Sequence, residues 1–176
     1  MSCLKGGRKH NMENHATFND ALPDYKEYFI KEALKKRFVL DTSVAAKWYY
    51  SKGEEDFSNS KLLYNNLHSD NSIFFAPDLL IYEILNIYRL KHELDEEDIN
   101  KIITELYDLI IILGVNKNTF LKSFAIARNL NISFYDSIYL SLAEDIDAVL
   151  ITADKKLYGA AKDTFRNTVL LAEFIF

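Results

Sequence analysis

The sequence predicts an α/β domain in which a mainly parallel sheet of about five strands lies between two layers of helices. Two observations carry this prediction. Short apolar segments alternate with longer helical patterns from residue 38 to the C-terminus. These segments are continuous apolar runs, which are typical of parallel strands covered on both faces. We therefore expect one three-layer α/β/α sandwich.

The alternation can be followed element by element. The predicted strands are residues 38–40, 73–76, 112–115, 148–151 and 168–170. The predicted helices are residues 43–50, 55–68, 77–92, 95–111, 119–130, 135–144 and 155–162. Pro77 suits the first turn of the third helix, and Asp95 starts the fourth as a cap with an acidic first turn.

The segment before the first strand has a different character. Residues 1–20 lack periodicity and predict a flexible extension, and a basic helix is expected over 24–37. We place the domain boundary between an extension, 1–36, and a domain, 37–176. The basic helix is expected either to pack as an arm, to cover a neighbouring groove, or to help the chain dimerise.

Composition narrows the class of protein. With 176 residues, 49% hydrophobic and 14% aromatic, the chain suits one folded domain. No apolar run reaches the roughly 18 residues of a membrane span, and no secretory signal is seen, so the expected location is the cytoplasm. The single cysteine, Cys3, excludes an internal disulfide. A net charge of −5 is unfavourable for nonspecific nucleic-acid binding.

Four acidic residues are the candidate site: Asp41, Glu83, Asp136 and Asp154. Each falls close after a predicted strand or in the helix beside one. The carboxyl ends of parallel strands meet at one edge of the sheet, where ligands bind. Crowded carboxylates repel each other, and the usual neutraliser is a hard divalent cation held by oxygen ligands. The pattern predicts a metal-dependent phosphodiesterase.

Each acid also has an ordinary explanation. Asp41 could cap the helix that follows it, although Thr42 and Ser43 could do so equally well. Asp136 and Asp154 each precede helical residues and could be caps too. Their weight as site residues comes from their combination with Asp41.

Glu83 is harder to explain as a surface residue. It lies in a helix that is apolar nearly all round, and such a helix is usually buried. A buried carboxylate needs a partner or a metal, and Asn86 shares its face. The alternative is a narrow solvent-facing edge formed by Glu83, Asn86 and Arg89. Near the end of a later helix, Glu144 and its acidic neighbours read as a solvated end, with Glu144 also a candidate for an outer shell of the site.

Four runs in order along the chain carry a family resemblance. They are residues 39–44 (VLDTSV), 77–86 (PDLLIYEILN), 135–143 (YDSIYLSLA) and 150–157 (LITADKKL). From residue 38 to the C-terminus the chain resembles the PIN domain, and within that family it most resembles VapC-type toxins. The resemblance implies a Rossmann-like fold and a magnesium- or manganese-dependent endoribonuclease.

The resemblance also assigns roles. The family's four acidic positions match Asp41, Glu83, Asp136 and Asp154. Thr152 matches a hydroxyl close to the site, and Ser43 and Asn86 are further candidates for an outer shell. RNA would be the substrate, a VapB-like antitoxin would mask the site, and the free chain would be a homodimer.

Two other readings compete with catalysis. A PIN-like module that binds RNA or protein without cleavage would keep the fold and fits the acidic composition. A phosphate-accepting receiver module would need an aspartate ending the third strand, where Asn116 stands.

Overall fold

The structure is a computed structural model that describes residues 33–49 and 56–175. The chain divides after Leu34, and the unit Lys35–Phe176 contains the α/β fold. Up to residue 32 the predicted basic helix lies outside the described residues. Its predicted end is wrong, because Lys36 and Arg37 already pair with the second strand.

The described residues contain one five-stranded sheet in the order β3-β2-β1-β4-β5, and every neighbouring pair is parallel. The strands are β1 (Lys36–Leu40), β2 (Ser72–Pro77), β3 (Ile111–Leu113), β4 (Val149–Thr152) and β5 (Thr168–Leu170). The predicted parallel sheet is confirmed. Because β1 is central, the chain builds outward through β2 and β3 and then returns to the other side of β1 at β4.

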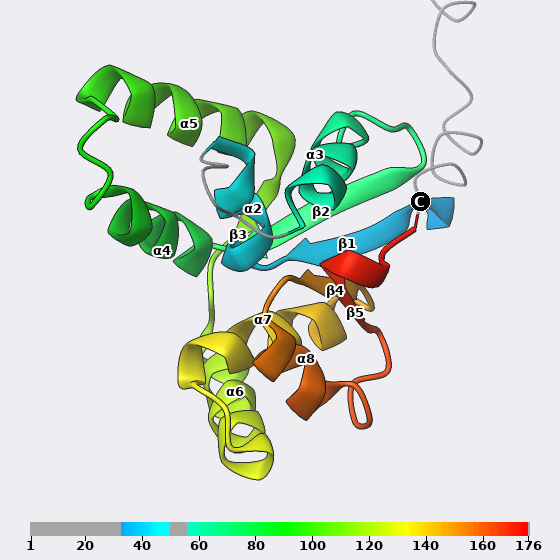
Figure 1. Cartoon of the computed structure of the whole chain (residues 1–176). Helices are drawn as coiled ribbons and strands as arrows, with labels where there is room; N and C mark the ends of the chain where they lie inside the picture. Colours follow the sequence, from blue (N-terminus) through cyan, green and yellow to red (C-terminus); the bar gives the residue numbers. More distant parts are fainter. Residues whose placement is uncertain (1–32, 50–55, 176) are drawn as a thin grey trace, which may run out of the picture. The chain divides into compact units, whose positions relative to one another are not determined.

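Helices cover both faces of this sheet (Figure 1). They are α2 (Thr42–Tyr49), α3 (Phe57–Asn65), α4 (Leu79–Tyr88), α5 (Glu96–Leu109), α6 (Lys117–Leu130), α7 (Phe134–Asp145) and α8 (Lys155–Ala161), with a short 3-10 helix, η2 (Leu171–Glu173), after β5. Figure 1 shows α2 to α5 on one side of the strands and α6 to α8 on the other.

Two hydrophobic cores lie on the two faces, as alternation along a strand requires. On β1, Phe38 and Leu40 belong to the core under α2 to α5, whereas Val39 belongs to the core under α6 to α8. Leu40 and Val39 are both fully buried, and each stabilises the fold by roughly 1.5–3 kcal/mol. In the part of the chain that is described, no helix has the length and apolar character of a membrane span.

The third helix differs most from its prediction. Pro77 is the last residue of β2, paired with Leu113, and lies before the helix rather than in its first turn. A proline is tolerated at a strand end because little ladder pairing follows it. The helix itself, α4, ends at Tyr88 rather than near residue 92, and two tight turns follow, through Lys91 to Leu94.

Candidate functional site

The centre of the site is formed where β1 and β4 end side by side. Leu40 pairs with Ile151, so Asp41 and Thr152 emerge together at the carboxyl edge of the sheet. The Asp41 amide donates to the Ile151 carbonyl at 3.1 Å. Strand order reverses between β1 and β4, and ligands of such sheets bind at that crevice. Asp41 therefore lies at this switch point.

Asp41 is a buried carboxylate held by hydroxyl groups. Only 7% of the residue is exposed. Its Oδ2 accepts from Ser43 Oγ at 2.6 Å and from Thr152 Oγ1 at 2.5 Å. Burial raises the pKa of Asp41 to about 6; the two hydroxyl bonds lower it, and the nearby charge of Glu83 raises it again. The protein therefore holds this carboxylate without neutralising its charge.

Glu83 is bound by a second set of hydroxyls. Its Oε2 accepts from Thr42 Oγ1 at 2.8 Å and from Tyr139 OH at 2.6 Å. The two hydroxyls are also 2.7 Å from each other, so the three groups form a closed ring. Burial, followed by the charges of Glu83 and Asp41, raises the pKa of Tyr139. The phenol therefore stays protonated and serves as a donor.

The helix that carries Glu83 is less buried than its composition predicts. Leu80, Ile84 and Tyr88 are buried, but the opposite face is open, with Tyr82 at 69% exposed. The expectation of an all-round buried helix is therefore wrong, because only one side of α4 has a neighbouring layer. Asn86 is exposed and accepts from Arg89 Nε at 2.7 Å, while Glu83 turns inward to the hydroxyl ring.

Asp136 lies in the first turn of α7 and is half-buried. The cap of this helix is Ser133, whose Oγ accepts from the Asp136 amide at 3.0 Å. The explanation of Asp136 as a cap is therefore wrong, since Ser133 already fills that place. Tyr139 follows one turn later on the same helix.

Asp154 does cap a helix. Its Oδ1 accepts from the amides of Lys156 at 2.6 Å and Leu157 at 3.1 Å, at the start of α8. Its own amide donates to Thr152 Oγ1 at 2.9 Å, and the same hydroxyl binds Asp41. Asp154 is thus one hydroxyl away from Asp41 while performing its capping role.

The structure brings the four acids together unequally. Asp41 and Glu83 interact through their charges, and Thr152 links Asp41 to Asp154. Among the described residues, no three acidic, histidine or cysteine side chains stand close enough to hold a metal ion together. The donors at the centre are nevertheless all oxygen atoms, the type that magnesium and manganese prefer. No ion pair between two described residues involves Asp41 or Glu83.

The ring around Glu83 was missed from the sequence. The sequence predicts Thr42 only as a possible helix cap, and it predicts no role for Tyr139. One signal was available, because Tyr139 lies in an apolar helix run where a buried phenol normally needs a partner.

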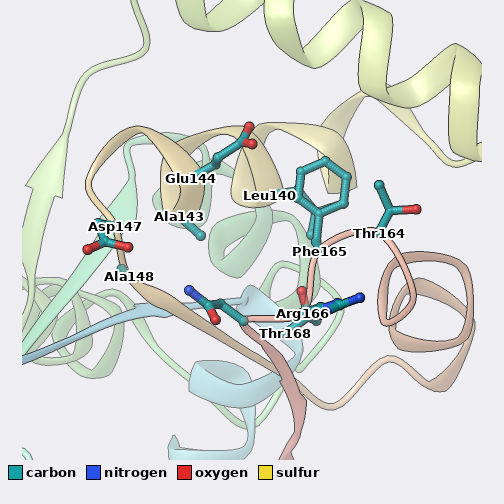
Figure 2. Close-up of a pocket in the computed structure, with 10 residues that line it drawn as sticks. Leu140, Ala143, Glu144, Asp147, Ala148, Thr164, Phe165, Arg166 and Thr168 are labelled. Carbon is teal, nitrogen blue, oxygen red and sulfur yellow. The ribbon is translucent and has the colours of Figure 1, made fainter.

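A cavity at the opposite edge of the sheet is separate from these acids. It has a volume of about 270 Å³ and is lined by residues next to the starts of β4 and β5, including Ala148 and Thr168 (Figure 2). Glu144 and Asp147 also line it, so Glu144 faces this edge rather than the carboxyl edge. None of the four predicted site acids is among its lining residues.

Comparisons with known proteins identify the family. The fold is similar to a toxin–antitoxin complex from Klebsiella pneumoniae, with 15% identity, a TM-score of 0.59, and coverage of 77% of this chain and 98% of that one. It is also similar to VapC20 from Mycobacterium tuberculosis, described as a sarcin–ricin-loop-cleaving toxin, with 12% identity, a TM-score of 0.57, and coverage of 70% and 95%. PAE2754 from Pyrobaculum aerophilum gives 18% identity, a TM-score of 0.56, and coverage of 78% and 90%.

At these identities the likeness shows the fold alone. No curated protein sequence is significantly similar to the chain. The sequence model of the PIN domain, however, matches residues 38–163, well over half of the chain. Together with the parallel sheet and the acids at its carboxyl edge, this match shows that the chain belongs to the PIN-domain family.

Proposed function

We propose that this chain is a metal-dependent endoribonuclease that hydrolyses RNA phosphodiester bonds. PIN domains are generally nucleases. The observation that carries the proposal is the pair Asp41 and Glu83, two interacting carboxylates at the switch point that hydroxyls hold in place. The pair has no cationic partner among the described residues, and such an arrangement is unfavourable unless a cation binds there in function.

The four acids divide the work in this proposal. Asp41 and Asp136 would be direct ligands of a magnesium or manganese ion. Glu83 and Asp154 would bind the ion through water, hold a second ion, or orient the attacking water. When bound, the ion polarises the phosphate and makes water a good nucleophile near neutral pH. Ser43 and Thr152 fix one oxygen of Asp41, and Thr42 and Tyr139 fix one oxygen of Glu83.

Cleavage of RNA under defined metal conditions tests this function. Purified chain is incubated with labelled RNA and magnesium or manganese, and the products are separated on a gel. EDTA and the substitution Asp41→Asn are both expected to abolish cleavage. Equal cleavage in EDTA, or by the D41N protein, would show that the metal–carboxylate mechanism is wrong.

We also propose that the chain is the toxin of a VapBC-type pair. The Klebsiella protein with this fold occurs in a toxin–antitoxin complex. On this chain, α4 presents an apolar face next to Glu83, with Tyr82, Leu85 and Ile87 exposed. A VapB-like antitoxin lying over this face would mask the site. Co-purification with the product of the adjacent reading frame, with loss of cleavage in the complex, is the expected result.

A homodimer is the proposed state of the free chain. Light scattering during gel filtration gives the mass, and the protein lacking residues 1–36 shows whether the extension takes part. An unchanged mass without the extension removes it from the interface.

The alternative is a PIN-like module that binds RNA or protein without cleaving it. The net charge of −5 favours the protein-binding form of this alternative, because a negative charge opposes the approach of RNA. Calorimetry separates the two functions. A nuclease of the proposed type takes up magnesium or manganese and loses this uptake in the D41N protein, whereas a binding-only module needs no such site.

A further inference from the structure

One long segment of this acidic chain contains no acidic residue at all. Between Asp108 and Asp136 the sequence has no aspartate or glutamate, but it has Lys117, Lys122 and Arg128. This segment forms β3, α6 and the start of α7, and it ends directly before one of the four proposed site acids. In a chain of net charge −5, such a segment is compatible with binding a polyanion.

The same segment exposes aromatic rings. Phe120, Phe124 and Tyr135 are 45%, 55% and 58% exposed. Phe134 joins them: its ring stacks on Phe120 at 6.2 Å with an interplanar angle of 24°, and it meets Tyr135 edge-on at 6.3 Å. We call Phe120, Phe124, Phe134 and Tyr135, together with Arg128, the aromatic platform.

Positive charge is part of this platform. The Arg128 guanidinium lies over the Phe124 ring, 5.8 Å from its centroid. Both residues line a shallow groove of about 500 Å³ between α6 and α7, with Phe134 on its other side. Lys122 contributes little here, because its ammonium is already bound to Glu144 and Asp145. The available cations are thus Arg128 and, at the start of α6, Lys117.

We propose that the aromatic platform binds unpaired bases of the RNA substrate and leads the strand to Asp136. Exposed rings beside a guanidinium are the usual means of binding single-stranded nucleic acid, because every base can stack on a ring while the cation contacts phosphate. A duplex offers no free base faces, so the preferred substrate is a single strand or a loop. This inference rests on the proposed nuclease function and assigns the surface that receives its substrate.

The charge pattern favours RNA over a second copy of the chain as the occupant. In a two-fold dimer the same patch meets itself. Because α6 carries Lys117, Lys122 and Arg128 and no acidic residue, a contact centred on this helix would bring basic residues of the two copies together. RNA supplies the opposite charge.

Binding can be measured without cleavage in the Asp41→Asn background. Fluorescence anisotropy with a labelled unstructured RNA, and with the same sequence as a duplex, gives the two affinities. The double substitution Phe124→Ala, Tyr135→Ala is expected to weaken single-strand binding about ten-fold or more, because each stacked base contributes substantially. Leu121→Ala is the matched control, since Leu121 is 62% exposed on the same helix but has no ring; it should change affinity less than two-fold.

Two further readouts mark the mode of binding. A 2-aminopurine in the single strand should lose fluorescence when it stacks on the platform. Arg128→Ala should reduce the salt dependence of binding by about one phosphate contact. These readouts do not require catalysis, so a failure of the proposed cleavage chemistry would leave them unchanged.

Three results would overturn the inference. The first is unchanged affinity in the Phe124, Tyr135 double variant, and the second is equal affinity for duplex and single strand. The third is a lower solution mass for that variant without RNA, which would make the platform an interface between copies of the chain.

Discussion

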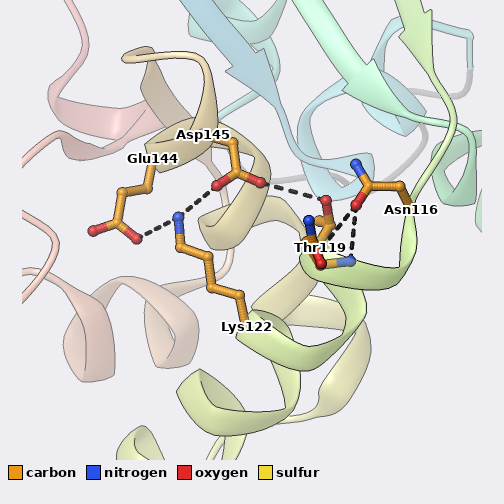
Figure 3. Close-up of polar contacts among 6 residues, drawn as sticks. Asn116, Thr119, Lys122, Glu144 and Asp145 are labelled. Atoms are coloured by element: carbon orange, nitrogen blue, oxygen red, sulfur yellow. Dashed lines mark hydrogen bonds and ion pairs between the residues drawn. The ribbon is translucent and has the colours of Figure 1, made fainter.

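Two pairs of carboxylates on the same domain are treated in opposite ways. Glu144 and Asp145, at the end of α7, share one cation: Lys122 Nζ lies 2.8 Å from Glu144 and 2.6 Å from Asp145 (Figure 3). At the carboxyl edge of the sheet, Asp41 and Glu83 interact through their charges, and the described side chains that donate to them are all hydroxyls. Within the described residues, Glu144 and Asp145 have a cationic partner, whereas Asp41 and Glu83 have none.

The difference has a physical cause in each place. Carboxylates at a helix C-terminus are unfavourable with the helix dipole, and Lys122 offsets this from the neighbouring α6. Burial lowers the pKa of Lys122, but its bonds to Asp145 and Glu144 outweigh burial and the net shift is upward. Asp41 is buried with no basic side chain bound to it in the part of the chain that is described, and burial raises its pKa. A buried carboxylate with a strongly raised pKa is typical of functional sites, whereas the partly exposed pair at Lys122 is an ordinary surface ion pair.

The largest expected effect is on the rate of RNA cleavage, when the glutamate of each pair is replaced by glutamine in turn. Glu83→Gln should reduce metal-dependent RNA cleavage roughly 1,000-fold, since it removes a charge from the centre of the site. Glu144→Gln is the matched substitution in the compensated pair and should leave the cleavage rate within about three-fold. Gel-based cleavage rates for the two proteins measure this, and similar losses in both would erase the distinction between the pairs.

The next effect is a dependence of stability on pH in the metal-free protein. The pKa of Asp41 is raised from 3.8 to about 6, so between these values the folded state holds the extra proton. The stabilisation of the folded state by protonated Asp41 is therefore fully present below about pH 4, and it is lost as the pH rises to about 6. The fall should be about 3 kcal/mol.

Urea unfolding in EDTA across this pH range measures the effect. Asp41→Asn should remove this part of the pH dependence and be the more stable protein near neutral pH. Identical pH profiles for the two proteins would contradict the buried, uncompensated state of Asp41.

A smaller effect is expected from the hydroxyl ring around Glu83. Tyr139→Phe deletes one hydroxyl donor while keeping the aromatic side chain that packs in the core. It should weaken manganese binding about ten-fold. Thr42→Val removes the second donor. Because both hydroxyls bind the same oxygen, calorimetry on the single and double variants should show non-additive losses. Unaltered metal affinity in all three proteins would make the ring purely structural.

The smallest effect belongs to the compensated pair itself. Lys122→Met should lower the free energy of unfolding by only about 0.5–1 kcal/mol, because all three charged groups are partly exposed to water. Cleavage and metal affinity should stay as in the original protein. A loss of several kcal/mol on urea unfolding would show that the pair is more strongly coupled to the fold than its exposure suggests.

Much of the fold follows from local pattern. Every predicted strand is present within about two residues, because continuous apolar runs with clear ends leave few other placements. The predicted end of α4 is wrong because no glycine or proline marks it. The predicted burial of α4 is wrong because composition alone does not say how many sides of a helix pack against other elements. Ser133 could have been chosen as the cap of α7 from the sequence, since it stands three residues before Asp136.

The sequence by itself determined which acids follow strands, and it determined that Thr152 stands two residues before Asp154. Only the tertiary structure decided that β1 lies centrally, which sets Asp41 beside Thr152. It also decided that Tyr139 and Thr42 meet at Glu83, because that contact joins residues 56 and 41 positions from Glu83 along the chain. The local hydrophobic pattern determines whether a segment is a helix or a strand. Which side chains of α2, α4 and α7 meet depends on how those helices pack.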